Sequence, residues 1–278
     1  MLYKPPCYPF FSAISRSCVL YLSRLKSGEE AGVAVPPGIK TMTIVRTLLV
    51  WLLGMSLTVL VFLAVSLIRV FDSKRAIIHS VGAVWSRCLI GLAGIKVDLR
   101  GGENIPKDTP VIFLSNHQGA FDIPALQGYM PVRFRWVAKK SLFKVPFLGW
   151  SMRLAGYIPI DRDNPVEAMK SMEEASEKIR AGASVLIFPE GTRSTTGALL
   201  PFKRGAFMLA RKSGAPIVPV AIKGTFEIMK RGSHIIRPSK VSISIGKPIP
   251  VGSSDEKELR NMTKKAVEAL YNDMRSSA

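Results

Sequence analysis

An uncharged apolar run from Thr47 to Ile68 constrains this chain more than any other feature of its sequence. The run is 22 residues long and rich in Leu and Val, and its polarity is limited mainly to Ser56, Thr58 and Ser66. About 20 apolar residues in a helix cross a hydrocarbon layer of ~30 Å, whereas a helix in a soluble core usually keeps one polar face. We therefore expect a membrane-embedded helix, either as a single span or as part of a re-entrant pair.

The next segment, residues 76–94, carries its large apolar side chains at helical spacing, with basic residues on or beside that face. This pattern is typical of an amphipathic helix at a membrane interface. Arg46 precedes the apolar run, and Arg69, Lys74 and Arg75 follow it, so the positive-inside rule favours a cytoplasmic C-terminal part. We predict a membrane protein, in the cell inner membrane or an equivalent membrane, whose C-terminal domain faces the cytoplasm.

The charge balance is strongly basic, with 39 Lys and Arg against 20 Asp and Glu, a formal net charge of +19 at pH 7. Nucleic acids and anionic membrane surfaces both suit such a charge. The sequence has no zinc-finger spacing, RNP-like aromatic run or basic zipper, and its basic residues occur beside apolar segments. We therefore predict membrane lipid as a partner and no nucleic acid.

The three cysteines, Cys7, Cys18 and Cys88, are too few and too scattered for a disulfide framework or a CxxC metal site. The sequence shows no other cluster with metal-ligand spacing, because His79 and His234 each stand alone. We predict no metal site.

Three parts follow from composition. Residues 1–43 are proline-rich and look poorly organised; they contain either a weak targeting segment or interfacial helix, or a dispensable extension before Met42. Residues 44–94 form the membrane-anchoring helical segment, and residues 95–278 form a globular domain.

In that domain, strand-like runs at 95–99, 111–115, 134–137, 184–188, 217–222 and 241–245 alternate with helical stretches. The alternation predicts an α/β fold with a mixed, mostly parallel sheet flanked by helices, behind N-terminal membrane-embedded and amphipathic helices.

Three of the helices can be placed from their sequence signals. One starts at Asn164-Pro165 and stops at Gly182, one covers 202–212, and the last is expected to begin at a Ser254 cap. The first of them is expected to bury a stripe of Val166, Met169, Met172 and Ile179. The last is expected to bury Leu259, Met262, Ala266, Leu270 and Met274.

Two polar segments follow buried strands. His117 and Asp122 come directly after the strand at 111–115, at the end where ligands gather in open α/β sheets. On a continuous helix the two side chains would point about 140° apart. A loop leading into a helix, relaxed at Gly119, lets Asp122 fold back onto the imidazole, where a carboxylate fixes the tautomer and leaves the other nitrogen free as a base.

The second segment, Phe188–Ser194, follows the strand at 184–188. Gly191 permits an unusual backbone angle, and Arg193 offers a planar fork of donors suited to phosphate. Glu190 either orients that arginine or accepts a substrate hydroxyl. Arg162 and Lys203 lie in two further segments, Gly156–Arg162 and Pro201–Gly205, that add cations near the same edge.

Four segments together resemble the conserved blocks of the glycerolipid acyltransferases, whose best-known members are the 1-acyl-sn-glycerol-3-phosphate acyltransferases. Residues 116–122, Asn-His-Gln-Gly-Ala-Phe-Asp, match the NHxxxxD block, and residues 188–194 match FPEGTRS. Gly156–Arg162 and Ile217–Ile222 resemble the second and fourth blocks. The resemblance covers about Val97 to Pro250.

The resemblance implies an O-acyltransferase of phospholipid biosynthesis. His117 takes the proton of a free hydroxyl, which attacks an acyl thioester, and Asp122 holds and stabilises His117. Neither GxSxG nor an obvious Cys-His pair is present, which agrees with direct transfer. The substrate site would comprise Glu190, Gly191, Thr192, Arg193, Lys203 and Arg162, with the arginines and the lysine on the substrate phosphate.

The implied reaction converts lysophosphatidate, 1-acyl-sn-glycerol-3-phosphate, to phosphatidate by acylating its sn-2 hydroxyl. No cofactor is expected, since acyl-CoA or acyl-carrier protein supplies the acyl group as a cosubstrate. Two alternatives stand beside it: an acyltransferase for another lysophospholipid or glycerol-phosphate acceptor, and a non-catalytic membrane protein that binds lipid.

Overall fold

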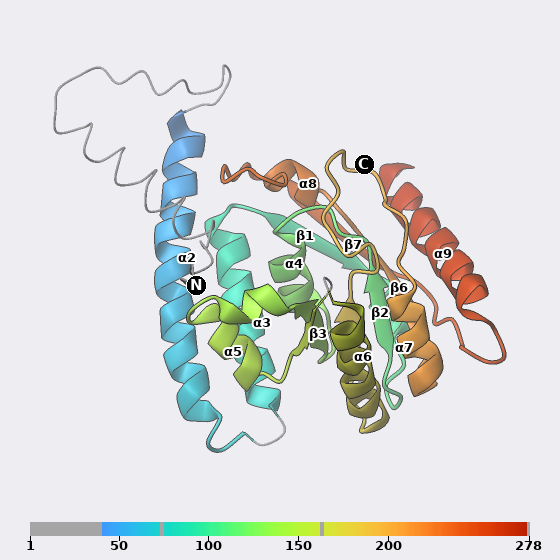
Figure 1. Cartoon of the computed structure of the whole chain (residues 1–278). Helices are drawn as coiled ribbons and strands as arrows, with labels where there is room; N and C mark the ends of the chain where they lie inside the picture. The colour runs from blue at the N-terminus through green and yellow to red at the C-terminus, as the bar shows by residue number, and fades with distance from the viewer. Residues whose placement is uncertain (1–40, 73–74, 162–163, 277–278) are drawn as a thin grey trace, which may run out of the picture. The chain divides into compact units, whose positions relative to one another are not determined.

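The computed structural model describes residues 41–72, 75–161 and 164–276 (Figure 1). The expectations for residues 1–40, Cys7 and Cys18 among them, and for Arg162 lie outside these residues. The helices are α2 (Thr41–Ile68), α3 (Ala76–Leu92), α4 (Asp122–Tyr129), α5 (Leu148–Leu154), α6 (Pro165–Arg180), α7 (Gly205–Ser213), α8 (Thr225–Ile228) and α9 (Glu256–Ser276), with short 3₁₀ turns at Gly102–Asn104 and Lys140–Lys144.

One seven-stranded sheet organises the domain, in the order β1-β7-β6-β2-β5-β3-β4. Its strands are β1 (Lys96–Arg100), β2 (Ile112–Ser115), β3 (Arg135–Lys139), β4 (Ile158–Ile160), β5 (Val185–Ile187), β6 (Ile217–Lys223) and β7 (Lys240–Ile245). Neighbouring strands run parallel except β6 and β7, which are antiparallel. The expected mixed, mostly parallel sheet is confirmed, although β4 and α5 were not expected as separate elements.

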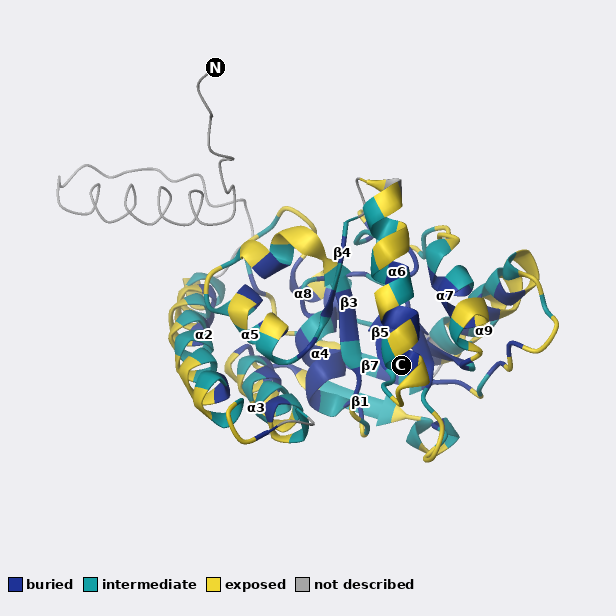
Figure 2. Ribbon diagram, turned by 60° about the horizontal axis from the view of Figure 1, so that its bottom comes forward, coloured by how far each residue is buried: buried dark blue, intermediate teal, exposed yellow. Residues whose placement is uncertain are grey.

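Alternation along the strands divides the core into two layers. Phe113 belongs to the cluster that α3 and α4 cover, whereas its neighbours Ile112 and Leu114 belong to the cluster under α6, α7 and α9. Figure 2 shows the strands in the centre as mostly buried and the outer faces of the helices as exposed. Because both faces of the sheet are covered at its centre, β2 and β5 are buried along their whole length, whereas β7 alternates between buried and half-buried residues.

Helix α6 begins as its sequence predicts. The side chain of Asn164 accepts hydrogen bonds from the backbone N–H groups of Val166 and Glu167, at 3.0 and 3.3 Å. The expected buried stripe is wrong in its first turn, however, because Val166 and Met169 are exposed while Met172 and Ile179 are buried. In this part of the helix, Ala168 packs on the core instead.

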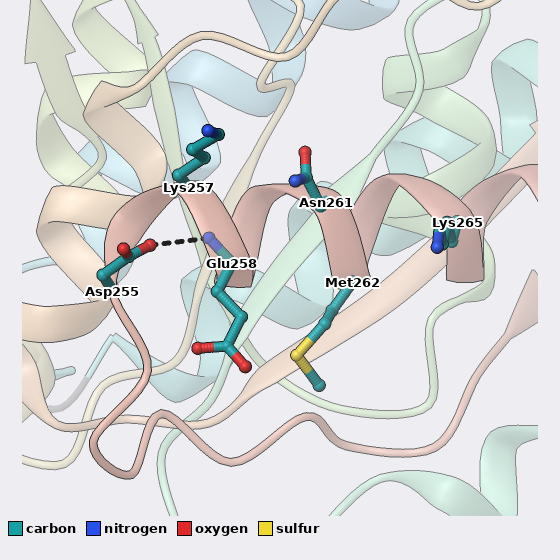
Figure 3. Close-up of a pocket in the computed structure, with 6 residues that line it drawn as sticks. All are labelled: Asp255, Lys257, Glu258, Asn261, Met262 and Lys265. Carbon is teal, nitrogen blue, oxygen red and sulfur yellow. Dashed lines mark hydrogen bonds between the residues drawn. The ribbon is translucent and has the colours of Figure 1, made fainter.

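Helix α9 is capped one residue later than expected. The carboxylate of Asp255, rather than Ser254, accepts the backbone N–H of Glu258 at 2.7 Å (Figure 3). The expected stripe is confirmed except at Met262: Leu259 and Met274 are buried and Ala266 and Leu270 pack on the core, whereas Met262 is exposed. Thr263 and Val267 are buried as well. A surface hollow along this helix is lined by its own residues from Asp255 to Lys265, and none of the expected site residues lines it.

Helix α2 is long and apolar enough to cross a membrane, judged by its length and composition. One side of it packs on the rest of the domain. Trp85 of α3 donates to the Thr58 hydroxyl at 3.1 Å, and a Cβ on Gly54 would lie 2.9 Å from Leu89. Near the start of the helix, the Thr47 hydroxyl accepts the backbone N–H of Ile236. The other side is exposed and consists largely of leucines: Leu48, Leu49, Leu52, Leu53, Leu60, Leu63 and Leu67.

Candidate active site

The candidate site lies where β2 and its neighbours end. β2 pairs with β5 on one side and β6 on the other, all three parallel. Two polar segments therefore leave the same edge of the sheet side by side: residues 116–121 after β2, and residues 188–194 after β5. The topology brings together the two blocks that the sequence singled out, although about 70 residues separate them.

His117 and Asp122 are in direct contact. Nδ1 of His117 lies 2.6 Å from Oδ2 of Asp122, which is fully buried. The same oxygen accepts the backbone N–H groups of Gln118 and Gly119, at 2.7 and 3.0 Å. Asp122 is the first residue of α4, so the positive end of the helix dipole also stabilises its negative charge. The loop leading into a helix forms as expected and leaves Nε2 of His117 as the free ring nitrogen.

The expected reason for Gly119 is corrected by the structure. Its φ is not positive, so the turn does not need glycine for its backbone angle. Instead, a Cβ at this position would lie 2.3 Å from the carbonyl oxygen of Thr225 at the start of α8. Glycine is required because α8 packs directly on the loop that carries His117.

Asn116 holds the same loop to the neighbouring strand. Its side-chain NH₂ donates to the carbonyl of Ile222, and its side-chain oxygen accepts the N–H of Ile222, both at 2.8 Å. Asn116 is fully buried. This reciprocal pair fixes the position of His117 relative to β6, a role that the sequence did not reveal.

The segment after β5 contacts His117 on three sides. Oε1 of Glu190 accepts the N–H of His117 at 3.2 Å, and the N–H of Ser194 donates to the carbonyl of His117 at 2.9 Å. The ring of Phe188 stacks on the imidazole, with centroids 3.9 Å apart and planes 6° from parallel. The main chain and the ring of His117 are both held by residues 188–194.

Glu190 lies beneath the site rather than on its surface. Only 2% of the residue is exposed, and burial raises the pKa of its carboxyl to about 8, with the nearby Asp122 acting in the same direction. Its Oε2 is buried without a hydrogen-bond partner. The structure thus places this side chain against the protein backbone, whereas sequence reasoning placed it against Arg193 or a substrate hydroxyl.

The cationic part of the site centres on Arg193, which is half-buried. Burial lowers the pKa of its guanidinium, and so does the charge of Arg231. Arg231 lies in the segment between α8 and β7 and was missed by the sequence reading, because nothing in its surroundings marks it. An anion bound at Arg193 would offset both effects.

Gly191 and Thr192 lie in the same turn as Arg193, and the side chain of Lys203 reaches this turn from a later segment. Gly191 has φ +73°, the left-handed backbone angle that the sequence suggested, and the side chain of Lys203 lies across it. Lys203 is exposed and Thr192 is half-buried. The backbone N–H of Lys203 donates to the carbonyl of Pro189 at 2.8 Å. Arg162 is outside the described residues.

This arrangement can move a proton. An imidazole whose Nδ1 is bonded to a buried carboxylate presents Nε2 as a base, and the carboxylate stabilises the imidazolium that forms. The side chain of His117 is 13% exposed, which leaves one part of the ring accessible. A half-buried arginine nearby can bind an anionic group of the molecule that gives up the proton.

Comparisons with known proteins find similarity to acyltransferases over most of the chain. A family model described as Acyltransferase matches residues 96–223. Chloroplastic 1-acyl-sn-glycerol-3-phosphate acyltransferases of Brassica napus and Arabidopsis thaliana are each 36% identical over 208 residues, which is 73% of this chain. The chain spans 60% and 58% of the length of these two relatives.

A solved structure is also similar. The crystal structure of the 1-acyl-sn-glycerophosphate (LPA) acyltransferase of Thermotoga maritima matches with a TM-score of 0.75 and 29% sequence identity. The match covers 84% of this chain and 96% of that one. Since the covered part exceeds the globular domain, the similarity extends into the N-terminal helices.

Proposed function

Because this chain belongs to the family of the 1-acyl-sn-glycerol-3-phosphate acyltransferases, we propose that it acylates the sn-2 hydroxyl of 1-acyl-sn-glycerol-3-phosphate, giving phosphatidate. The acyl group comes from a thioester, either acyl-CoA or acyl-carrier protein. The observation that carries the proposal is the bond between His117 and the buried carboxylate of Asp122, at the sheet edge where ligands bind. A protein that only binds lipid has no need of an oriented base.

The proposed reaction uses one base in two steps. Nε2 of His117 removes the proton from the sn-2 hydroxyl as its oxygen attacks the thioester carbonyl carbon. A C–O bond forms, and the C–S bond then breaks as the tetrahedral intermediate collapses. The imidazolium returns its proton to the departing thiolate, so His117 ends the cycle neutral. Asp122 stabilises the imidazolium between the two transfers.

The acceptor's phosphate is proposed to bind beside the dyad at Arg193. Its guanidinium can form two parallel hydrogen bonds with a phosphomonoester. Lys203, from across Gly191, adds a second cation, and Arg162 is a further candidate from the sequence. Glu190, with Oε1 already accepting the N–H of His117, supports the site from below. Gly191 and Thr192 contribute the turn that sets the direction of Arg193.

The membrane supplies the acceptor in this proposal. Lysophosphatidate has one acyl chain and remains in the lipid layer, and α2 has an exposed leucine face suited to hydrocarbon. We propose that the catalytic domain lies on the cytoplasmic side, where soluble acyl-CoA or acyl-carrier protein can reach it. Residues 1–43, 44–94 and 95–278 remain the proposed extension, anchor and catalytic domain.

A direct assay tests the proposal. The purified full-length chain, in detergent or lipid vesicles, is given labelled acyl-CoA or acyl-carrier protein and a panel of acceptors: lysophosphatidate, other lysophospholipids and glycerol 3-phosphate. We expect labelled phosphatidate as the main product. A different preferred acceptor would replace the substrate in the proposal, and the absence of any acylated product with every acceptor would refute it.

A further inference from the structure

We propose that Phe188 is a positioning residue for the reaction: its ring fixes the plane of the His117 imidazole so that Nε2 points at the acceptor hydroxyl. This inference rests on the proposed function for its kinetic consequence. Phe188 itself lies under the base and touches no reacting atom in the proposed mechanism.

The hydrogen bond to Asp122 does not fix the imidazole by itself. A single hydrogen bond between Nδ1 and Oδ2 restrains the ring softly, and small coupled rotations about χ1 and χ2 still allow its plane to rock. Such rocking would swing Nε2 sideways. A flat surface against one face of the imidazole removes this motion, and the Phe188 ring supplies it at a centroid distance of 3.9 Å and 6° from parallel.

The main chain of His117 is held by the same segment. Glu190 accepts its N–H, and Ser194 donates to its carbonyl. The base and the stacked ring therefore belong to one hydrogen-bonded unit formed by two loops. A shift of either loop would carry the other with it, so the stack is preserved when the site adjusts to substrate.

Phe188 is in turn fixed from behind. It is 7% exposed, and its ring lies 5.5 Å from that of Trp136, centroid to centroid. The indole N–H of Trp136 donates to the side-chain oxygen of Gln127 at 2.8 Å, which sets the orientation of the indole. These contacts keep Phe188 from turning away from His117.

Phe134 offers a matched control. Both phenylalanines are buried in the same hydrophobic cluster, and both contact Trp136, but Phe134 has no ring contact with His117. Phe→Leu at either position removes a flat ring and leaves a branched apolar side chain of similar bulk. The two variants therefore share the loss of core packing and differ in the support of the imidazole.

The kinetic test compares Phe188→Leu with Phe134→Leu in the full-length protein, with thermal unfolding of each. We expect kcat to fall at least about tenfold in Phe188→Leu, since small misplacements of reacting groups cost up to ~10²-fold. KM for lysophosphatidate and for the acyl donor should change little, because neither substrate contacts Phe188. Phe134→Leu should retain a kcat close to wild type at a similar loss of thermal stability.

A second measurement needs no turnover. The chain has three histidines, so ring-labelled histidine gives three sets of NMR signals, and a His117→Gln variant identifies those of His117. Atoms above the face of an aromatic ring are shifted upfield. At constant pH, the His117 ring signals should move downfield in Phe188→Leu and stay in place in Phe134→Leu.

The two arms separate failure of this inference from failure of the proposed function. If wild type acylates no acceptor, the proposed function fails, and the NMR shift still reports the stack. Equal kcat values for the two leucine variants, or a rise in acceptor KM at unchanged kcat in Phe188→Leu, would overturn the positioning role. Unchanged His117 signals in Phe188→Leu would overturn the stacked geometry itself.

Discussion

Nδ1 of the His117 imidazole lies 2.6 Å from Oδ2 of the Asp122 carboxylate. His117 is in the loop before α4, and Asp122 is the first residue of that helix. If this pair forms the base, His117→Ala should lower the rate of acyl transfer by ~10²–10⁴-fold. Asp122→Asn should also be severely impaired, because it keeps the shape and loses the charge that supports the imidazolium. Initial rates with labelled donor measure both. Near-normal turnover in a folded, membrane-bound His117→Ala protein would remove His117 from the mechanism.

Substitutions of Arg193 distinguish a role in phosphate binding from a role in catalysis. Arg193→Ala should weaken use of lysophosphatidate by about 1.5–3 kcal/mol for a lost charged hydrogen bond, or roughly ten- to a hundredfold. Arg193→Lys should have a smaller effect of the same kind, since it keeps the charge and loses the paired geometry. The measurement is KM for acceptor and donor, each at saturating partner. A larger effect on the donor would assign Arg193 to the thioester, and Lys203 or Arg231 would become the candidate phosphate ligands.

The dyad was predictable from sequence because it depends on local geometry. A buried strand ending at Ser115 places the next residues at the sheet edge, and a loop before a helix lets Asp122 return to His117. The arrangement of neighbouring strands was not predictable in the same way. That β5 lies beside β2, so that Glu190 and Ser194 reach the His117 main chain, depends on pairing between distant segments.

For other residues the predicted burial or role was wrong or missing, because a sequence pattern does not show which elements pack against a residue. Val166 and Met169 continue the helical stripe of α6, yet this part of the helix contacts the core through Ala168, and they remain exposed. Arg231 has no neighbouring motif, and only its charge effect on Arg193 in the folded protein draws attention to it. The contact of Gly119 with Thr225 likewise exists only in the folded protein.

Glu190 predicts a pH dependence of stability. Its pKa is raised from the ordinary 4.5 to about 8 in the folded protein, so the folded state binds the proton more tightly than the unfolded state. This contribution is fully present below pH about 4.5 and is lost as pH rises through about 8, at most a few kcal/mol in all. The free energy of unfolding in urea should therefore fall with pH across this window. In Glu190→Gln, whose side chain does not titrate, the free energy of unfolding should fall less steeply with pH. If it falls as steeply as in wild type, another group is responsible for the pH dependence.

The exposed leucines of α2 predict how the protein attaches to membranes. Leu52, Leu60 and Leu63 are 66%, 62% and 57% exposed, so replacing all three by Gln leaves the packed side of the helix intact. Each substitution removes about 1.5–3 kcal/mol of favourable free energy for transferring a leucine side chain from water into hydrocarbon. The triple variant should therefore shift from the membrane pellet to the supernatant. Met262→Gln, at an exposed position on α9, is the control and should leave the distribution unchanged. Removing residues 1–41 should also leave the protein attached; release by that deletion alone would place the anchor before Met42.

A substitution at Gly119 tests the contact between α8 and the loop that carries His117. In Gly119→Ala the new methyl group would lie 2.3 Å from the carbonyl oxygen of Thr225 and 2.8 Å from its carbonyl carbon. Both are backbone atoms, so no side-chain rotation can relieve the clash, and either α8 or the loop must shift. Overpacking of this kind costs about 1–3 kcal/mol of stability.

The same shift should appear in catalysis, because Gly119 also donates its N–H to Oδ2 of Asp122. Moving that donor displaces the carboxylate that holds His117, and kcat should fall further than the loss of stability alone explains. The matched control is Gly91→Ala in α3, where an added Cβ has no atom within 4 Å, apart from its own helix. Alanine is favoured over glycine in a helix by about 1 kcal/mol, so the control should be as stable as wild type or more so, with unchanged kcat. A Gly119→Ala protein with wild-type kcat and thermal stability would contradict the packing of α8 on the loop that carries His117.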